Sequence, residues 1–273
     1  MGVQINPERD ALLTELGKTT LTDRYLQPGE SYQQAFARVA TAYGDDPAHA
    51  QRMYDYMSSH WFMPATPVLA NGGTDKNLPI SCYLNSVEDT MGSILDVFHE
   101  TGWLSCRGGG VGTYWGQVRE VGSHVGGKPD AEGVGPWMVI QSSYARAVNQ
   151  GSTRNASVAF YLDVDHPEIE SFIEIRDPKG DPYRKTPQSH HGVLITDKFM
   201  DAVMSDSPFD LISRKTGEVV ETVSARKLWN KMLAYRLKLG EPFMIFIDSV
   251  NRKSSPVYQN LNLKVTQSNL CTE

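Results

Sequence analysis

Several short, almost wholly apolar segments constrain what this chain can fold into. Residues 243–247 (FMIFI) contain no polar side chain, and residues 157–162 (SVAFYL) and 192–196 (GVLIT) contain few. Strands that are apolar on both sides are typical of parallel sheets, because both faces of such a sheet are covered. Helical patterns lie between these segments, and alternating strands and helices predict an α/β layer or barrel.

The helical patterns divide the chain into two regions. Residues 89–104 and 133–150 carry apolar side chains at the spacing of an amphipathic helix. The clearest helix covers residues 224–239, which begin with a serine cap and are followed by a glycine stop signal. Residues 1–62 also show helical patterns, so we predict a small helical region ahead of an α/β domain at 63–273.

Composition and charge exclude several classes of protein. The chain has 273 residues, of which 40% are hydrophobic and 21% charged, as in ordinary globular proteins. A net charge of −6 argues against broad nucleic-acid binding, which needs a field of Lys and Arg side chains. No segment approaches the ~18 consecutive apolar residues of a membrane-spanning helix. We therefore expect neither a nucleic-acid partner nor a membrane partner.

The cysteine pattern limits the thiol chemistry. Cys82, Cys106 and Cys271 lie far apart and form no CxxC pair, which excludes a zinc ribbon and a disulfide scaffold. The N-terminal segment also lacks the pattern of a signal peptide, so we expect a cytoplasmic location. In that reducing compartment, a thiol is either a small buried apolar side chain or a catalytic group.

A glycine-rich run covers residues 107–116 (RGGGVGTYWG). The run lacks the Gly-Lys-Ser/Thr ending of a P-loop, and Trp115 stands where a dinucleotide fingerprint needs its third glycine. Two interpretations stay open. The glycines allow a ligand or another chain segment to approach the backbone closely, or they form a tight turn from helix to strand.

The last residues carry a candidate catalytic row. If this segment is extended, Asn269, Cys271 and Glu273 point to one face, because the side-chain period of a strand is two. An amide, a thiol and a carboxylate would then lie side by side, as a hydrogen-bonding group, a nucleophile or radical carrier, and a base. Terminal residues are often unstructured, and that alternative stays open.

Six motifs occur in order along the chain: FMPATPVLANGG (62–73), LPISCYL (78–84), SCRGGGVG (105–112), QGSTR (150–154), LDVDHPEIE (162–170) and QSNLCTE (267–273). Together they resemble the large, catalytic subunit of ribonucleotide reductase. The resemblance implies a ten-stranded α/β barrel built from two half-barrels, with a finger loop carrying a thiyl-radical cysteine. This chain would supply the first half-barrel, preceded by the small helical region.

The resemblance also implies roles for single residues. Cys271 matches the radical cysteine, which abstracts the 3′ hydrogen of a ribonucleotide. Glu273 matches the carboxylate that takes the 3′-hydroxyl proton, and Asn269 matches the amide that hydrogen-bonds the substrate. Cys82 matches one of the two thiols that reduce the 2′ position. Cys106 has no role that we can assign, so we interpret it as structural.

The same resemblance implies two sets of binding residues. Four positions match substrate-binding residues: Thr66, Ser81, Gly110 and Arg154. Five positions match the site for a deoxynucleoside triphosphate or ATP effector: Asp89, Thr90, Met91, Arg119 and Gln150. Residues 150–154 match the loop that passes effector identity to substrate choice.

Two groups of residues resemble metal ligands. His190 and His191 lack a third ligand at suitable spacing, so we interpret them as loop or strand-end residues. Asp163, Asp165 and His166 precede a predicted helix start, and we interpret them as helix capping. We predict no metal site.

The family implies cofactors and partners that act with this chain. We expect no cofactor bound directly by the chain. The radical would come from a metal-containing small subunit, with adenosylcobalamin as the alternative. The partners implied are a thioredoxin- or glutaredoxin-type reductant, the ribonucleotide substrate and a second copy of the assembled subunit, paired through helices near residues 89–104 and 133–150.

Two departures from the family pattern shape the functional hypothesis. The first motif begins at residue 62, so we expect no ATP-binding regulatory cone. The chain ends at Glu273, just after the radical cysteine. We therefore expect the N-terminal piece of a split catalytic subunit, active only with a C-terminal partner piece. The alternative is a non-catalytic module that binds the effector and serves assembly.

Overall fold

The computed structural model describes residues 2–76, 78–124, 126, 130–148 and 156–272. The chain forms two compact units, Met1–Ser81 and Cys82–Glu273. The boundary predicted from the sequence, after residue 62, lies inside the first unit.

The first unit is helical. Its elements are the 3₁₀ helix η1 (Pro7–Leu12) and the helices α1 (Glu15–Arg24), α2 (Tyr32–Tyr43), α3 (Pro47–Ser58) and α4 (Thr66–Asn71). The first turn of α2 is fixed by a capping box, in which Ser31 and Gln34 bond each other's backbone N–H groups. Helices α2 and α3 pack around fully buried side chains such as Phe36 and Tyr54, which supplies the unit with its own core.

The second unit is built on a parallel sheet. Its strands are β1 (Cys82–Ser86), β2 (Gly110–Tyr114), β3 (Ser157–Asp163), β4 (His190–Ile195) and β7 (Phe243–Phe246), in that spatial order. The register places Cys82 beside Gly110, and Tyr114 beside Tyr161. The predicted α/β class is therefore confirmed, and the three apolar segments are strands β3, β4 and β7.

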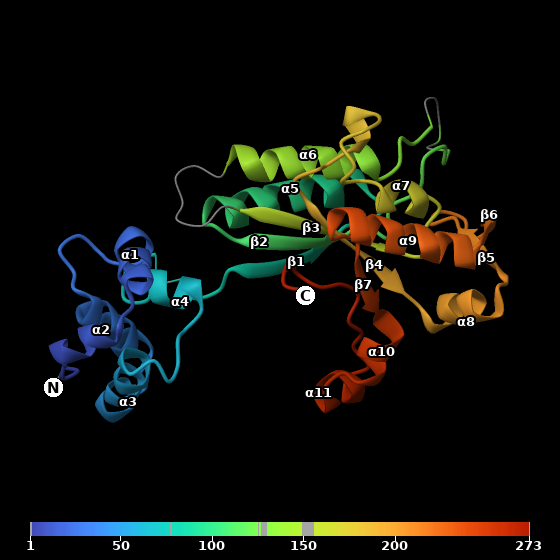
Figure 1. Ribbon diagram of the computed structural model, residues 1–273. Helices are drawn as coiled ribbons and strands as arrows, with labels where there is room; N and C mark the ends of the chain where they lie inside the picture. The colour runs from blue at the N-terminus through green and yellow to red at the C-terminus, as the bar shows by residue number, and fades with distance from the viewer. Residues whose placement is uncertain (1, 77, 125, 127–129, 149–155, 273) are drawn as a thin grey trace. The chain divides into compact units, whose positions relative to one another are not determined.

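Helices and a hairpin complete the second unit (Figure 1). They are α5 (Met91–Cys106), α6 (Gly135–Ala147), α7 (Ile169–Ile173), η2 (Pro182–Arg184), α8 (Asp197–Ser205), the antiparallel pair β5 (Pro208–Ile212) and β6 (Val219–Ser224), α9 (Ala225–Leu239), α10 (Ile247–Arg252) and α11 (Pro256–Asn260). Helices α5 and α6 lie side by side along the sheet, whereas α10 and α11 extend away from it. Ser224 caps α9 and Gly240 follows its end, as predicted.

The two faces of the sheet have different covers. Alternate side chains of β3, including Val158, Phe160 and Leu162, lie in the large core that α5, α6, α7 and α9 help to form. Ala159 and Tyr161 point to the other face and form a small buried cluster with strands β4 and β7. Leu270 of the C-terminal segment packs against this cluster. The segment that bears the cysteine therefore covers part of the sheet face opposite the helices.

One interpretation from the sequence is wrong. Helix α7 begins only at Ile169, and no side chain caps it. Asp165 instead pairs with Arg214, Asp163 accepts a hydrogen bond from Tyr114, and His166 contacts the Val118 carbonyl. Asp163 and Asp165 therefore bind distant segments rather than the helix N-terminus, whereas His166 bonds both the Val118 carbonyl and the nearby Glu168 N–H.

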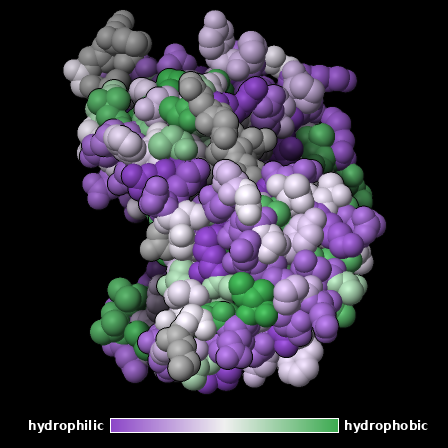
Figure 2. Space-filling model, turned by 90° about the vertical axis from the view of Figure 1, so that its left-hand side faces the viewer, coloured by the Kyte–Doolittle hydropathy of each residue, from purple (hydrophilic) through white to green (hydrophobic). Residues whose placement is uncertain are grey.

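The surface of the molecule is mixed. Figure 2 shows one face, on which hydrophobic side chains form separate groups among hydrophilic ones. Among the described residues, no helix has the length and apolar character needed to cross a membrane.

Candidate functional site

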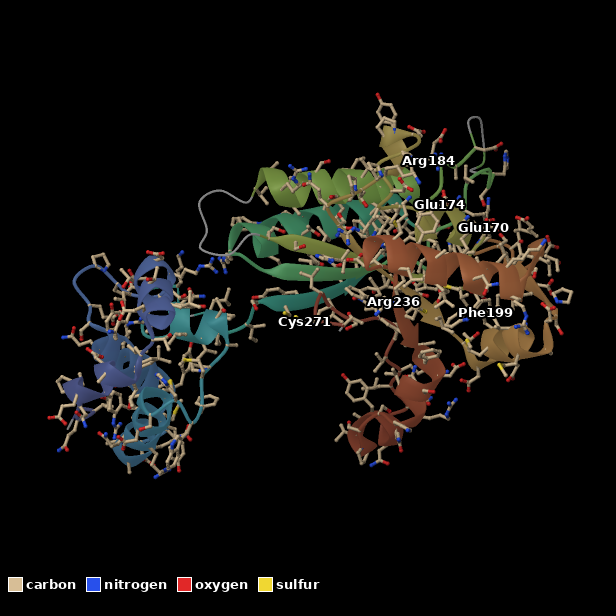
Figure 3. The ribbon with its side chains drawn as sticks, in the orientation of Figure 1. Glu170, Glu174, Arg184, Phe199, Arg236 and Cys271 are labelled. Carbon is tan, nitrogen blue, oxygen red and sulfur yellow. The ribbon has the colours of Figure 1, made fainter. Side chains whose placement is uncertain are left out.

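The two cysteines singled out by the resemblance lie together. The sulfur atoms of Cys82 and Cys271 are 3.8 Å apart, although 189 positions separate the residues in the chain. Cys82 is the first residue of β1 and is half-buried, and Cys271 is exposed. Figure 3 shows Cys271 beside β1, well away from the charged side chains of Glu170, Glu174 and Arg184. A small side-chain movement would bring the two sulfur atoms to bonding distance.

A glycine allows the C-terminal segment to reach this position. A Cβ atom at Gly112 would lie 2.1 Å from the Ser268 carbonyl oxygen and 2.8 Å from the Asn269 Cα atom. The buried Gln267 side chain donates hydrogen bonds to the backbone carbonyls of Asn85 and Gly112. Both interpretations of the glycine-rich run therefore hold. Residues 107–109 turn the chain from α5 into β2, and Gly112 admits another chain segment.

The segment itself is bent rather than regularly extended. The chain bends at Leu270, and the Asn269 Oδ1 atom accepts a hydrogen bond from the Cys271 N–H at 2.8 Å. This contact is an Asx turn, in which a side chain replaces a backbone acceptor. Asn269 therefore orients Cys271 directly, and its side-chain NH₂ group is a further potential donor. Glu273 lies outside the described residues.

The structure describes three of the four predicted substrate residues. Gly110 lies at the start of β2, opposite Cys82 in the register. Ser81 directly precedes Cys82 in the chain. Thr66 belongs to the first unit, where it starts α4 and its hydroxyl lies 3.1 Å from the Tyr25 hydroxyl. Arg154 lies outside the described residues. Within the second unit, the structure thus brings Gly110 together with the cysteine pair.

The predicted effector residues gather at the start of α5. The Arg119 Nε atom donates to both carboxylate oxygens of Asp89, at 2.9 and 2.8 Å, and the Arg119 backbone N–H donates to Oδ1 at 3.2 Å. Hydrogen bonding to Asp89 raises the pKa of Arg119. Thr90 caps α5, and the Met91 side chain beside it is 57% exposed. Gln150 lies outside the described residues.

A half-buried acid–phenol pair lies on the same sheet face as the cysteines. The Tyr114 hydroxyl donates to Asp163 Oδ2 at 2.6 Å. Burial raises the pKa of both groups, and the neighbouring Arg214 guanidinium opposes this shift. Each residue ends its strand, so the pair ties the carboxyl ends of β2 and β3 together.

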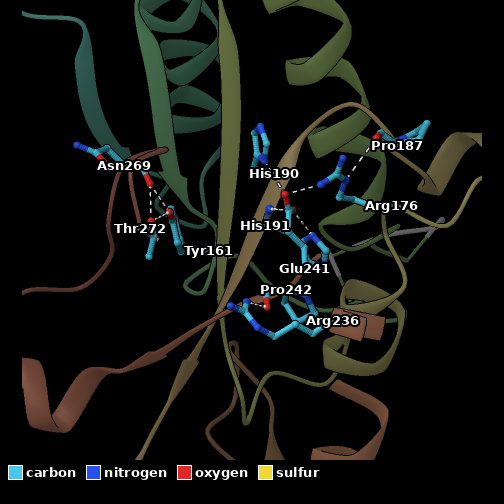
Figure 4. A network of polar contacts seen from close by, with 10 residues as sticks. All are labelled: Tyr161, Arg176, Pro187, His190, His191, Arg236, Glu241, Pro242, Asn269 and Thr272. Atoms are coloured by element: carbon cyan, nitrogen blue, oxygen red, sulfur yellow. Dashed lines mark hydrogen bonds and ion pairs between the residues drawn. The ribbon is translucent and has the colours of Figure 1, made fainter. Parts of the chain in front are cut away.

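No group of described residues has the geometry of a metal site with three or more His, Cys, Asp or Glu ligands. His190 begins β4, as predicted for a strand-end residue. Both His190 and His191 bond the nearly buried Glu241 carboxylate, which also pairs with Arg176 (Figure 4). These contacts join the start of β4 to the residues ahead of β7.

Sequence reasoning missed two residues that hold the cysteine segment. The Tyr161 hydroxyl donates to the Asn269 carbonyl and contacts the Thr272 hydroxyl. Gln267 anchors the segment to β1 and β2, as described above. Gln267 stands inside the last motif, and this position could have marked it as a site residue. Tyr161 lies in an apolar strand, and the pattern of that strand does not show which aromatic side chain faces the site.

Comparison with known proteins identifies the family. Residues 80–273 match the family described as ribonucleotide reductase, barrel domain, and residues 11–77 match the one described as ribonucleotide reductase, all-alpha domain. The chain belongs to the ribonucleotide reductase large-subunit family. The resemblance read from the motifs is therefore confirmed, and the parallel sheet is part of that family's barrel domain.

Relatives of this ribonucleotide reductase chain are longer than the chain itself. The ribonucleoside-diphosphate reductase large subunit of Invertebrate iridescent virus 6 is 36% identical over 98% of the chain, which covers 28% of that relative. A putative large subunit of Frog virus 3 is 38% identical over 90% of the chain and 42% of the relative. The subunit alpha of Helicobacter pylori strain J99 is 31% identical over 99% of the chain and 38% of the relative. The chain thus spans less than half of each of these three relatives.

Proposed function

We propose that this chain is the N-terminal part of a catalytic subunit that reduces ribonucleoside diphosphates to deoxyribonucleotides by thiyl-radical chemistry. The observation that carries the proposal is the 3.8 Å separation of the Cys82 and Cys271 sulfur atoms. A radical thiol and a reducing thiol must both reach one ribose, and this separation supports that arrangement. The names of the relatives, which are diphosphate reductases, support the substrate class.

The proposed reaction needs a radical, a base and two reducing thiols. Cys271, as a thiyl radical, takes the 3′ hydrogen atom, and Glu273 takes the 3′-hydroxyl proton. The 2′-hydroxyl then leaves as water. Cys82 and a second thiol supply two electrons and two protons and become a disulfide. The 3′ hydrogen then returns to carbon and regenerates the Cys271 radical. Asn269 holds the Cys271 backbone and offers its NH₂ group to the substrate.

The binding residues complete this proposal. Thr66, Ser81, Gly110 and Arg154 hold the substrate. The effector, a deoxynucleoside triphosphate or ATP, binds at Asp89, Thr90, Met91, Arg119 and Gln150. The ion pair of Asp89 with Arg119 supports this site, because it fixes a guanidinium at the start of α5.

The proposal includes several partners. A C-terminal piece supplies the rest of the barrel, because the relatives are longer and because α11 and the residues after it expose Val257, Leu261 and Leu263 by 50–64%. A metal-containing small subunit, or in the alternative adenosylcobalamin, supplies the radical. A thioredoxin- or glutaredoxin-type protein restores the thiols. The cytoplasm is the proposed location, since thiols stay reduced there.

Pairing of two assembled subunits uses helices α5 and α6. These helices expose large apolar side chains at 40–59%: Met91, Leu95, Trp103, Ile140 and Tyr144. Exposed apolar groups of this kind favour burial against a second protein surface. A homodimer through these helices is therefore part of the proposal.

Serine replacement of single cysteines tests the catalytic role. In the complete assembly, Cys271→Ser should abolish deoxynucleotide formation, and Cys82→Ser should block turnover at the reducing step, because it removes one of the two reducing thiols. Cys106→Ser is the matched control, because Cys106 is exposed at the end of α5 and, within the described part of the chain, its thiol bonds the Trp103 carbonyl. Full turnover by Cys271→Ser with effector binding retained would favour the non-catalytic effector-binding module instead.

A further inference from the structure

We propose that Tyr161 is a positioning residue that holds Cys271 in place for the reaction. The inference rests on the proposed function, in which Cys271 carries the radical. It adds a residue from the sheet to a site otherwise built from the cysteine motifs, and it assigns a purpose to a tyrosine buried among apolar groups.

The Tyr161 hydroxyl bonds residues on both sides of Cys271. It donates to the Asn269 carbonyl, two positions before the cysteine, and lies 2.7 Å from the Thr272 Oγ1 atom, one position after it (Figure 4). Thr272 Oγ1 also donates to the Asn269 carbonyl at 2.9 Å. The phenol thus belongs to a triangle of close polar contacts on both sides of the cysteine, in which two hydroxyl protons serve three oxygen atoms.

Tyr161 is itself rigidly held. The side chain is fully buried in the middle of β3, within the cluster that includes Ala159 and Leu194. Its ring lies against Gly192 on the next strand, where an added Cβ would be 2.7 Å from the ring Cε1 atom. A buried aromatic ring on a central strand has few alternative positions. The sheet therefore supplies a fixed reference point for a segment that has no regular secondary structure.

Positioning of this kind affects the rate more than binding. Radical transfer and hydrogen abstraction depend on distances that change steeply with displacements of about 1 Å, and a misplacement of that size can cost about 100-fold in rate. Losing the Tyr161 hydroxyl removes the hydrogen bonds and leaves the ring packing intact. The substrate pocket would keep its shape while Cys271 samples more positions.

Tyr114 offers a matched control. It lies next to Tyr161 in the register of β2 and β3 and on the same sheet face. Its hydroxyl bonds Asp163 and, among the described residues, none of those at 267–272. Tyr114→Phe and Tyr161→Phe therefore remove the same group from neighbouring strands, but only Tyr161→Phe removes a contact to residues 269–272.

The first measurement does not depend on turnover. The complete native protein is oxidised with diamide, which takes one hydrogen atom from each thiol so that an S–S bond forms, and the peptide linking Cys82 to Cys271 is quantified by mass spectrometry. We expect Tyr161→Phe to slow this linkage about fivefold or more, because a freer segment lowers the effective concentration of the thiol. Tyr114→Phe should link at the wild-type rate.

The second measurement is steady-state turnover of the complete assembly. Tyr161→Phe should lower kcat about tenfold or more and change KM less than twofold, whereas Tyr114→Phe should change neither beyond twofold. An unchanged linkage rate or an unchanged kcat in Tyr161→Phe would overturn the proposal. If wild-type protein shows no reductase activity, the proposed function fails and the linkage rates alone decide the role of Tyr161. If Tyr161→Phe does not fold, Thr272→Val removes the other hydroxyl, with the same expected results.

Discussion

Gly112 lies so close beneath Ser268 that a Cβ atom at position 112 would be 2.1 Å from the Ser268 carbonyl oxygen. The two residues belong to β2 and to the C-terminal segment that carries Cys271. Their contact shows that the sheet face is shaped to receive this segment. The size of residue 112 therefore controls where the cysteine lies.

Gly112→Ala should displace the cysteine segment. The added methyl group must push away the backbone at residue 268, at a cost of about 1–3 kcal/mol in unfolding free energy if the segment stays docked. We expect the diamide linkage of Cys82 with Cys271 to slow at least about tenfold. Urea unfolding measures the change in unfolding free energy, and mass spectrometry of the linked peptide measures the linkage rate. Gly92→Ala is the control, because no atom of the described residues outside its own helix turn lies within 4 Å of a Cβ there. Equal linkage rates in both variants would contradict the prediction.

The buried His166 should make the protein sensitive to mild acid. Its Nδ1 atom accepts from the Glu168 N–H at 3.1 Å and its Nε2 atom contacts the Val118 carbonyl at 3.0 Å, which together fix the neutral tautomer. Burial lowers the pKa of His166 to about 4.

The sign of this effect follows from proton binding. Between the unfolded value of about 6.5 and the folded value, the unfolded chain binds a proton that the native protein does not. The stabilising contribution of neutral His166 to the free energy of unfolding is therefore fully present above about pH 6.5. It is lost as the pH falls through 4, by about 3 kcal/mol in total. Urea unfolding across this range measures the loss. His166→Asn should make the free energy of unfolding less dependent on pH between about 6.5 and 4. If the variant shows the same pH dependence as the wild-type protein, His166 is not the group responsible.

Glu241 should produce a separate loss of stability in stronger acid. Burial opposes ionisation, but hydrogen bonds from His190 at 2.5 Å and from the His191 backbone N–H at 2.8 Å lower the pKa of Glu241 to about 2. Since the folded pKa lies below the unfolded value of about 4.3, the contribution is present above pH 4.3 and is lost as the pH falls toward 2. Glu241→Gln should cost about 2–4 kcal/mol at pH 7, because it leaves buried donors without a charged acceptor. Glu221→Gln, at an exposed position of β6, should have little effect.

The Asp89–Arg119 pair should govern effector binding. Asp89→Asn removes the charge that both holds and neutralises the Arg119 guanidinium. We expect the affinity for the effector to fall about tenfold. Calorimetry with a deoxynucleoside triphosphate measures this affinity. Stability should change by less than about 1 kcal/mol, because the pair is partly exposed. Asp96→Asn, an exposed change of the same kind on α5, is the control, and equal affinities in the two variants would contradict the prediction.

The fold was predictable where burial leaves a pattern in the sequence. Strands β3 and β7 are apolar because both sheet faces are covered, and α9 carries clear start and stop signals. The β5–β6 hairpin was missed because most residues of β6 are exposed, so no alternation marks it. The capping interpretation of Asp165 was wrong because Asp165 stands ahead of a helix, as a cap does, but pairs with Arg214, which lies far along the chain.

The candidate site was predictable only in part, because several of its contacts join segments that are far apart in the sequence. The motifs identified Cys82 and Cys271, whose proximity requires the sheet register and the path of the last residues. Neither Tyr161 nor Gly112 could be assigned a partner from the sequence, because their contacts depend on which strand the C-terminal segment crosses. Local patterns report burial and capping, whereas these contacts are set by tertiary structure.

Gln267 fixes the cysteine segment to the sheet by hydrogen bonds to the backbone carbonyls of Asn85 and Gly112. Every residue type offers a carbonyl at these positions, so the tether does not depend on the side chain at position 85. Substitutions at Asn85 would disturb its contact with Thr113 but would keep the Gln267 hydrogen bonds that hold the cysteine segment. Position 85 of β1 can thus differ between relatives without moving Cys271.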